Sequence, residues 1–270
     1  MYYQCFNGVF SDAAVPVIPA VNKGYRYGDG FFETLRVHHS AIPLWDLHRG
    51  RILRSLSLLD YSFAGDVSPE RLYEEILKLC GLNHCQENAR VRLSFSNGDG
   101  GLFDRSGLHY LIEAEPFAPA PDKGLLLGLY NEMQKEVHRF SELKLSASFI
   151  YSRAAQCCNR QGWNDCVILN KKQQVVETSI SNLFWIKDGA LFTPPVTDGC
   201  VAGVFRSYLL TAEPGITERS CTPETLKEAD ALFLTNALRG IRNVVQYDGK
   251  CYNGALTASL QHRHNQLLFS

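Results

Sequence analysis

The 270-residue sequence has no long hydrophobic run, no CxxC pair and no excess of charge of either sign. No segment approaches the roughly 18 uninterrupted apolar residues of a membrane span, and residues 1–8 do not combine a basic start with an apolar core. We therefore expect no membrane association, and a reducing cytoplasm is the expected location. Because 27 Lys and Arg nearly balance 28 Asp and Glu, no overall field favours nucleic acid, and a small anionic ligand fits better.

The spacing of cysteines and histidines argues against metal sites and disulfides. The nine cysteines are an odd set, and the neighbouring pair at 157–158 is too close in sequence to form an unstrained bridge. The histidines at 38, 39, 262 and 264 have no cysteine or carboxylate at a metal-ligand spacing. We predict no disulfide framework and no metal.

One change in composition divides the chain near its middle. Residues 116–121 contain three prolines in six positions, which disfavours both a helix and a central strand. We expect a smaller N-terminal domain over 1–115, a linker at 116–121 and a larger C-terminal domain over 122–270.

Hydrophobic periodicity predicts mixed helices and strands in both halves. The first half is expected to hold helices at 45–59 and 69–80 and a hairpin of strands at 90–96 and 108–115. In the second half we predict helices at 149–161, after 203 and from about 256, and strands at 167–169, 175–177, 183–186, 191–193, 231–235 and 244–247. Short adjacent strands with interspersed helices favour an α+β fold over a regular parallel α/β sheet.

Lys144 and Glu177 are the residues that suggest a chemistry. A lysine amine can hold a cofactor aldehyde as a Schiff base, and a carboxylate on a separate element can keep a pyridine nitrogen protonated. This pair is what a pyridoxal phosphate enzyme needs. Taken alone, Lys144 reads as a solvated residue and Glu177 as a polar position on a half-exposed strand, so neither carries the hypothesis by itself.

Further motifs follow in a fixed order. The segment 27–36 precedes a helix that carries His48, Arg51 and Ser55, and the stretch 176–184 follows Lys144. With these pieces in sequence, nearly the whole chain resembles the class IV aminotransferases, the fold-type IV pyridoxal phosphate enzymes. The resemblance implies a two-domain α+β architecture like that of the D-amino acid aminotransferases, a small-molecule amino substrate and a homodimer.

The resemblance assigns a role to each matching residue. Lys144 matches the catalytic Schiff-base lysine, Glu177 the partner of the pyridine nitrogen, and Arg51 the arginine that pairs with the phosphate. Val201 matches the apolar residue against the cofactor ring. The remaining matches are Gly203, Val204 and Phe205, whose backbone N–H groups would meet the phosphate at a helix start, Asn236 and Ala237 in a second phosphate-side loop, and Tyr27, Phe32 and Thr34 in the substrate pocket.

The subgroup rests on Asn236-Ala237, a form typical of the aminodeoxychorismate lyases, which release pyruvate and 4-aminobenzoate for folate synthesis. Two departures point elsewhere. Leu102 stands where those lyases tend to carry an arginine, unless Arg105 or another residue replaces it, and residues 145–148 lack the family's asparagine, for which Tyr151 is a candidate substitute. The alternatives are an amino acid transaminase of branched-chain or D-amino acid type and, more remotely, a non-catalytic cofactor-binding protein.

Overall fold

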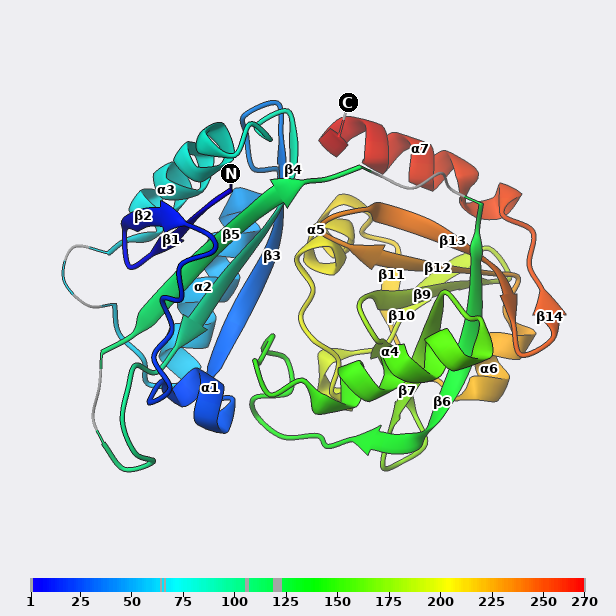
Figure 1. Ribbon diagram of the computed structural model, residues 1–270. Coiled ribbons are helices and arrows are strands. Elements are labelled where there is room, and N and C mark those ends of the chain that lie inside the picture. The colour runs from blue at the N-terminus through cyan, green and yellow to red at the C-terminus, as the bar shows by residue number, and fades with distance from the viewer. Residues whose placement is uncertain (1, 64, 66, 105–106, 119–122, 270) are drawn as a thin grey trace. The chain divides into compact units, whose positions relative to one another are not determined.

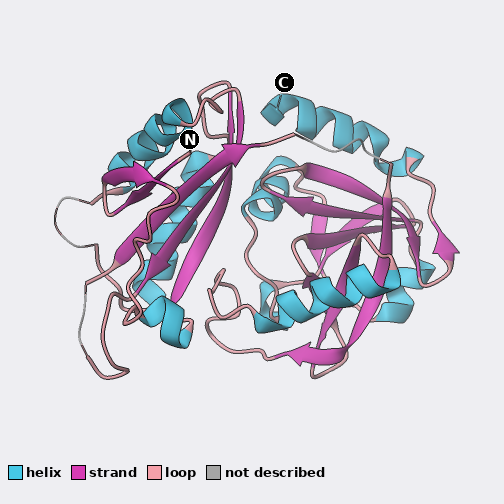
Figure 2. Cartoon of the chain, viewed as in Figure 1, coloured by secondary structure: helices cyan, strands magenta, loops and turns pink. Residues whose placement is uncertain are grey.

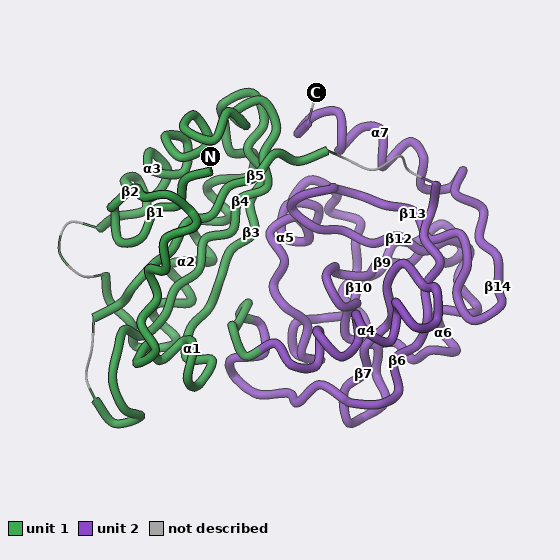
Figure 3. Tube along the Cα trace, in the orientation of Figure 1, with its two compact units in different colours: residues 1–119, 143–147 green, residues 120–142, 148–270 purple. Residues whose placement is uncertain are grey.

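The computed structural model describes residues 2–63, 65, 67–104, 107–118 and 123–269. The chain forms two compact units (Figure 3): the first holds residues 1–119 and 143–147, and the second holds 120–142 and 148–270. Part of the predicted linker, 119–121, lies outside the described residues, and Pro116 is the last residue of a strand. The segment Leu143–Ala147, assigned from the sequence to the second domain, groups with the first unit because its backbone pairs with a strand there.

The first unit is built on an antiparallel sheet in the order β2-β1-β5-β4-β3. One face of this sheet is covered by two long helices (Figure 1). Its strands are β1 (Tyr3–Phe6), β2 (Val9–Asp12), β3 (Gly30–His38), β4 (Asn88–Ser96) and β5 (His109–Pro116), and its helices are α1 (Lys23–Tyr27), α2 (Trp45–Leu58) and α3 (Pro69–Leu82). The predicted helices and the hairpin of β4 and β5 are confirmed.

Strict alternation along β4 explains how this sheet has two different faces. Val91, Leu93 and Phe95 are buried in the core with the helices, whereas Arg92 and Ser94 point to the opposite, polar face. The same alternation along β3 decides which of its side chains can line a pocket and which are enclosed beneath the helices.

The second unit contains a larger mixed sheet, whose strands are magenta in Figure 2. Their order is β11-β10-β9-β12-β13-β6-β7-β8, and β14 pairs with β13. The pairs β10–β11, β13–β6 and β6–β7 are parallel and the others antiparallel. The strands are β6 (Leu125–Lys135), β7 (Asp165–Asn170), β8 (Val175–Thr178), β9 (Asn182–Lys187), β10 (Ala190–Thr193), β11 (Ile216–Glu218), β12 (Ala231–Asn236), β13 (Gly240–Tyr247) and β14 (Lys250–Cys251). The predicted α+β class is confirmed.

Three helices of the second unit match the predicted positions, and the short helix α6 (Pro223–Glu228) was not predicted. The three are α4 (Phe149–Gln161), α5 (Val204–Ala212) and α7 (Ala255–Phe269), and a short 3-10 turn η1 (Val196–Asp198) precedes α5. Helix α4 ends at Gly162, whose φ of 72° is in the left-handed region that glycine adopts most readily. Within the described part of the chain, no helix is both long and apolar enough to cross a membrane.

Candidate active site

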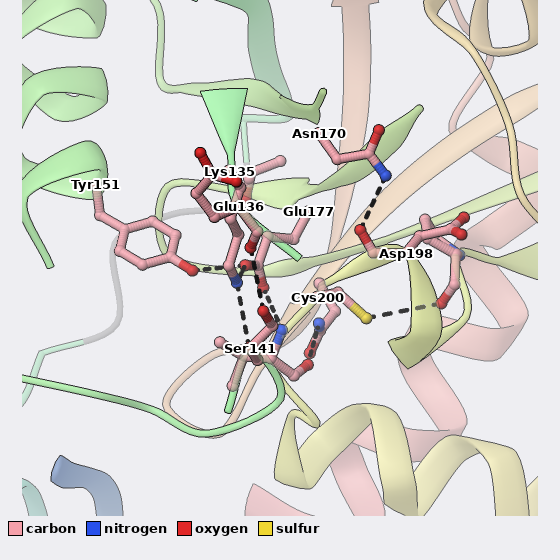
Figure 4. A network of polar contacts seen from close by, with 12 residues as sticks. Lys135, Glu136, Ser141, Tyr151, Asn170, Glu177, Asp198 and Cys200 are labelled. Atoms are coloured by element: carbon pink, nitrogen blue, oxygen red, sulfur yellow. Dashed lines mark hydrogen bonds and ion pairs between the residues drawn. The ribbon is translucent and has the colours of Figure 1, made fainter. Parts of the chain in front are cut away.

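The turn between β8 and β9 is the centre of the candidate site in the second unit. Glu177, on β8, is buried, and its carboxylate accepts three hydrogen bonds (Figure 4). Lys135 Nζ and Tyr151 OH donate to Oε1 at 2.6 and 2.7 Å, and the backbone N–H of Val201 donates to Oε2 at 3.0 Å. A buried carboxylate is thus held by β6, α4 and the turn before α5.

Asn182, the first residue of β9, ties this turn to the start of α5. Its side-chain Nδ2 donates to the carbonyl oxygen of Val201 at 2.9 Å. A Cβ atom on Gly203 would lie 1.8 Å from Asn182 Oδ1, so only glycine allows this approach. Gly203 is the N-cap of α5 with no side-chain cap, and the backbone N–H groups of Val204 and Phe205 lie in the first turn, where an α-helix favours an anion.

Asn236, the last residue of β12, reaches the same turn from the other side. Its Nδ2 donates to Ser181 Oγ at 3.1 Å, and its Oδ1 accepts the backbone N–H groups of Leu238 and Arg239 at 3.2 and 3.0 Å. Ala237 lies within the turn that this asparagine shapes. The structure therefore brings four of the predicted segments together around the β8–β9 turn: those of Glu177, Val201, Gly203 and Asn236.

Asp165, the first residue of β7, holds the same turn by hydrogen bonds. Its carboxylate accepts from Thr178 Oγ1 at 2.7 Å and from the backbone N–H and Oγ of Ser179 at 2.9 and 2.6 Å. Burial raises the pKa of Asp165 against the opposing effect of these hydrogen bonds. The Asp165 carboxylate and the thiols of Cys158 and Cys166 offer possible metal-ligand atoms within 4.8 Å of one another. The hydrogen bonds to Thr178 and Ser179 account for the carboxylate without a metal.

Lys144 belongs to the first unit by its backbone. Its carbonyl oxygen accepts the N–H of Phe32 at 2.9 Å, which places the lysine beside β3. Its Nζ lies 4.6 Å from the centre of the Phe32 ring, and the side chain is half-buried. Glu142, two residues earlier, accepts the N–H of Ala202 at 2.9 Å and so contacts the turn that leads into α5.

Arg51 is paired with a residue that the sequence did not single out. Its Nε and Nη2 donate to the two carboxylate oxygens of Glu33 at 2.7 and 2.6 Å, and His48 Nδ1 lies 2.7 Å from Glu33 Oε2. Burial alone would raise the pKa of Glu33, but Arg51 and His48 outweigh it and lower that pKa to about 2. Burial lowers the pKa of His48, so its ring donates as a neutral group. The role of Arg51 at a phosphate stays a prediction.

The predicted substrate-pocket residues separate into two groups. Phe32 and Thr34 lie half-buried on the polar face of β3, whereas Tyr27, at the end of α1, is 45% exposed. Arg92, directly opposite Thr34 on β4, was not predicted: its guanidinium carbon lies 3.9 Å from the centre of the Phe32 ring and its Nε donates to Ser94 Oγ at 3.1 Å. No carboxylate of the described residues forms an ion pair with Arg92, although Glu113, opposite it on β5, acts on it electrostatically. Its alternation with Val91 was the one sequence signal that could have found it.

The loop between β4 and β5 carries Leu102 where an arginine was expected. Leu102 is 64% exposed, and Arg105, the first suggested replacement, lies outside the described residues. Lys135, the other cation that the sequence did not reveal, is the last residue of β6, a strand that the periodicity did not predict. Tyr151, the candidate substitute for the missing asparagine, donates a hydrogen bond to Glu177.

The profile of the family described as Amino-transferase class IV matches residues 30–247. The chain belongs to this family. This membership confirms the predicted resemblance and, with it, the expectation of a pyridoxal phosphate-dependent enzyme.

The similar proteins come from more than one branch of the family. The chain is 28% identical to an aminodeoxychorismate lyase of Bacillus subtilis, over 94% of this chain and 91% of that protein. It is 27% identical to a putative branched-chain-amino-acid aminotransferase of Methanocaldococcus jannaschii, over 97% of this chain and 94% of that protein. Its fold matches the branched-chain aminotransferase of Thermoproteus uzoniensis with a TM-score of 0.90 at 21% identity, over 99% of this chain and 94% of that one.

Proposed function

We propose that this chain binds pyridoxal phosphate through Lys144 and acts as a 4-amino-4-deoxychorismate lyase, releasing pyruvate and 4-aminobenzoate. The observation that carries the cofactor site is the convergence of Glu177, Val201, Gly203 and Asn236 on one turn. The lyase assignment depends on Asn236-Ala237, and similarity to a lyase of Bacillus subtilis supports it.

The residues around the β8–β9 turn fit this cofactor. An ionised carboxylate offers about four acceptor positions, and the three donors on Glu177 leave one on Oε2 for a protonated ring nitrogen. The uncapped first turn of α5, which only a glycine at 203 can lead into, offers backbone N–H groups to a phosphate. When bound, pyridoxal phosphate supplies an electron sink for the substrate carbon attached to its amine nitrogen.

Lys144 carries two tasks in this proposal. Its amine would hold the cofactor aldehyde, and once a substrate amine took its place the freed lysine amine would remove a proton from the substrate carbon that carries the amine. Glu177 would keep the ring nitrogen protonated, which matters most when that carbon carries negative charge. In the lyase, loss of that proton would accompany cleavage of the C–O bond to the enolpyruvyl group, so that the ring becomes aromatic and the leaving group takes up a proton as pyruvate.

Arg92 supplies the positive charge that Leu102 does not. Its guanidinium and the Lys144 amine both lie against the Phe32 ring, and its side-chain hydrogen bond to Ser94 leaves donors for a carboxylate even beside Glu113 on β5. A guanidinium fork matches a carboxylate in two hydrogen bonds, so we propose that Arg92 binds a carboxylate of the substrate. A substrate that carries a carboxylate, as the lyase requires, would match this contact.

A transaminase of the branched-chain or D-amino acid type is the second candidate. It is favoured by the missing arginine at Leu102 and by the similarity to a branched-chain aminotransferase. A homodimer and a cytoplasmic location also belong to the proposal, as the family resemblance and the sequence suggest.

Product analysis distinguishes the two candidates. The purified protein with pyridoxal phosphate is mixed with aminodeoxychorismate or with D- or L-amino acids and a keto acid. Release of 4-aminobenzoate and pyruvate is the expected result. If an amino acid instead converts the absorbance band of the lysine-bound cofactor to that of the aminated cofactor, with no 4-aminobenzoate released, the protein is a transaminase.

The role of Arg92 has a matched control on the same strand. Arg92→Leu is expected to raise the KM for aminodeoxychorismate about 100-fold, while the absorbance band of the lysine-bound cofactor is kept. Arg90→Leu removes an exposed arginine that pairs with Glu115 and should leave KM nearly unchanged. Equal KM values for Arg92→Leu and the unmodified enzyme would refute the carboxylate contact.

A further inference from the structure

The second cation of the candidate site, Lys135, has no role in the proposed reaction. It lies at the end of β6, with its side chain 11% exposed, and its Nζ is 2.6 Å from Glu177 Oε1. The same Nζ lies 3.4 Å from the carbonyl oxygen of Ser141, and the Tyr151 ring centre is 5.3 Å away (Figure 4). Ser141 is itself held by Glu136 and His138, so Lys135 has a fixed position.

We propose that Lys135 is a positioning residue that shares the Glu177 carboxylate with the pyridine nitrogen of the cofactor and thereby weakens the hold of that nitrogen on its proton. The proposal rests on the proposed function, because it takes Glu177 as the partner of the ring nitrogen. One lysine of this chain would then set the strength of the electron sink.

The charges around Glu177 carry this inference. Lys135 and Glu177 form a neutral pair before any ligand is added. A protonated ring nitrogen on the remaining Oε2 position would be a second cation on one carboxylate, and like charges at such a distance disfavour each other. Lys135 therefore opposes protonation of the ring, while Glu177 favours it.

The other titratable groups facing Glu177 do not cancel this effect. Burial, with the Glu177 charge, raises the pKa of Tyr151 from α4 well above 10, so its hydroxyl donates as a neutral group. The same causes raise the pKa of the Cys200 thiol, in the turn before α5, to about 12. Among the described residues, Lys135 is the cationic side chain in contact with this carboxylate.

The test follows the ring nitrogen directly, by the ¹⁵N chemical shift of a ¹⁵N-labelled cofactor bound to the protein, as a function of pH. Lys135→Met is expected to raise the pH at which the nitrogen loses its proton by about one unit. Lys135→Arg keeps the charge and should titrate like the unmodified protein. Lys171→Met is the matched control, because that lysine pairs with Glu136 at the surface and is 66% exposed.

Lys135→Gln gives a second route if Lys135→Met does not fold. It removes the same charge with a neutral polar side chain, so the shift should again be upward. An unshifted titration in the folded Lys135→Met protein, or in Lys135→Gln if the former is lost, overturns the role of Lys135. A protein without any lysine-bound cofactor, seen as a missing near-visible band, would instead overturn the proposed function.

Discussion

A buried glutamate anchors a polar cluster in each unit, Glu33 in the first and Glu177 in the second, and the two carboxylates are held in different ways. Glu33 accepts two hydrogen bonds from Arg51 and contacts His48, whereas Glu177 accepts one each from Lys135, Tyr151 and the backbone of Val201. Arg51 grips both oxygens of Glu33 as a fork, whereas Lys135 touches only Oε1 of Glu177. A bidentate pair fixes a helix on a sheet, and a single-point pair leaves an oxygen able to face a ligand.

The largest effect is expected when the fork in the first unit is broken. Glu33→Gln leaves the Arg51 charge, 9% exposed, without its anion and should lower the free energy of unfolding by about 3–5 kcal/mol in urea denaturation. Glu115→Gln, which breaks an exposed pair with Arg90, should cost less than about 1 kcal/mol. Similar losses for the two variants would remove the distinction between a buried and an exposed pair.

Acid should weaken the same cluster. The pKa of Glu33 falls from 4.5 to about 2 on folding, so the unfolded chain binds this proton first as the pH is lowered. The stability that Glu33 provides is complete above pH 4.5 and is lost as the pH falls toward 2, by about 3 kcal/mol. The lowered pKa of His48 adds a loss in the same direction below pH 6.5. Urea titrations between pH 7 and 2 check this, and Glu33→Gln should flatten the lower part of the curve.

The corresponding change in the second unit should affect catalysis more than folding. Glu177→Gln keeps the shape but cannot stabilise a protonated ring nitrogen, so kcat should fall about 100-fold. Glu136→Gln alters an exposed carboxylate on the neighbouring loop and should leave kcat nearly unchanged. A Glu177→Gln enzyme with full kcat would mean that this carboxylate does not serve the cofactor.

Exchanging the cations gives the smallest and most specific comparison. Arg51→Lys loses the fork to Glu33 and should cost about 2 kcal/mol of stability. Lys135→Arg replaces a single-point contact and should cost less than about 1 kcal/mol in the same urea experiment. Equal costs would show that fork geometry does not distinguish the two clusters.

Local rules predicted the elements that carry a clear signal. Helix α4 was predicted at its observed bounds because Gly162 closes it, and β4 because its alternation is unbroken. Strand β6 was missed: its first five residues are apolar or glycine, and Gly128 packs so closely on Trp163 that a Cβ would lie 2.0 Å from that ring. Strands β1 and β2 were also missed, because neither alternates: Gln4 and Cys5, adjacent in β1, are both buried, and no residue of β2 is buried.

Local sequence signals also predicted only part of the candidate site. Glu177 and Gly203 follow from ordered motifs, but Lys135 meets Glu177 across 42 residues, from a strand that was not predicted. Glu33 lies within the segment 27–36 but has no role assigned from the sequence, because its partners on α2 are set by how that helix packs on the sheet. Contacts between distant elements depend on the fold and leave no local pattern.

The most direct test of the central claim is to reduce the protein with borohydride in the presence of pyridoxal phosphate and to locate the modified lysine by peptide mass mapping. The account predicts the phosphopyridoxyl group on Lys144, and Lys144→Ala should lose it. A group found on Lys135 instead would contradict both the assignment of the cofactor lysine and the role given to the Lys135–Glu177 pair.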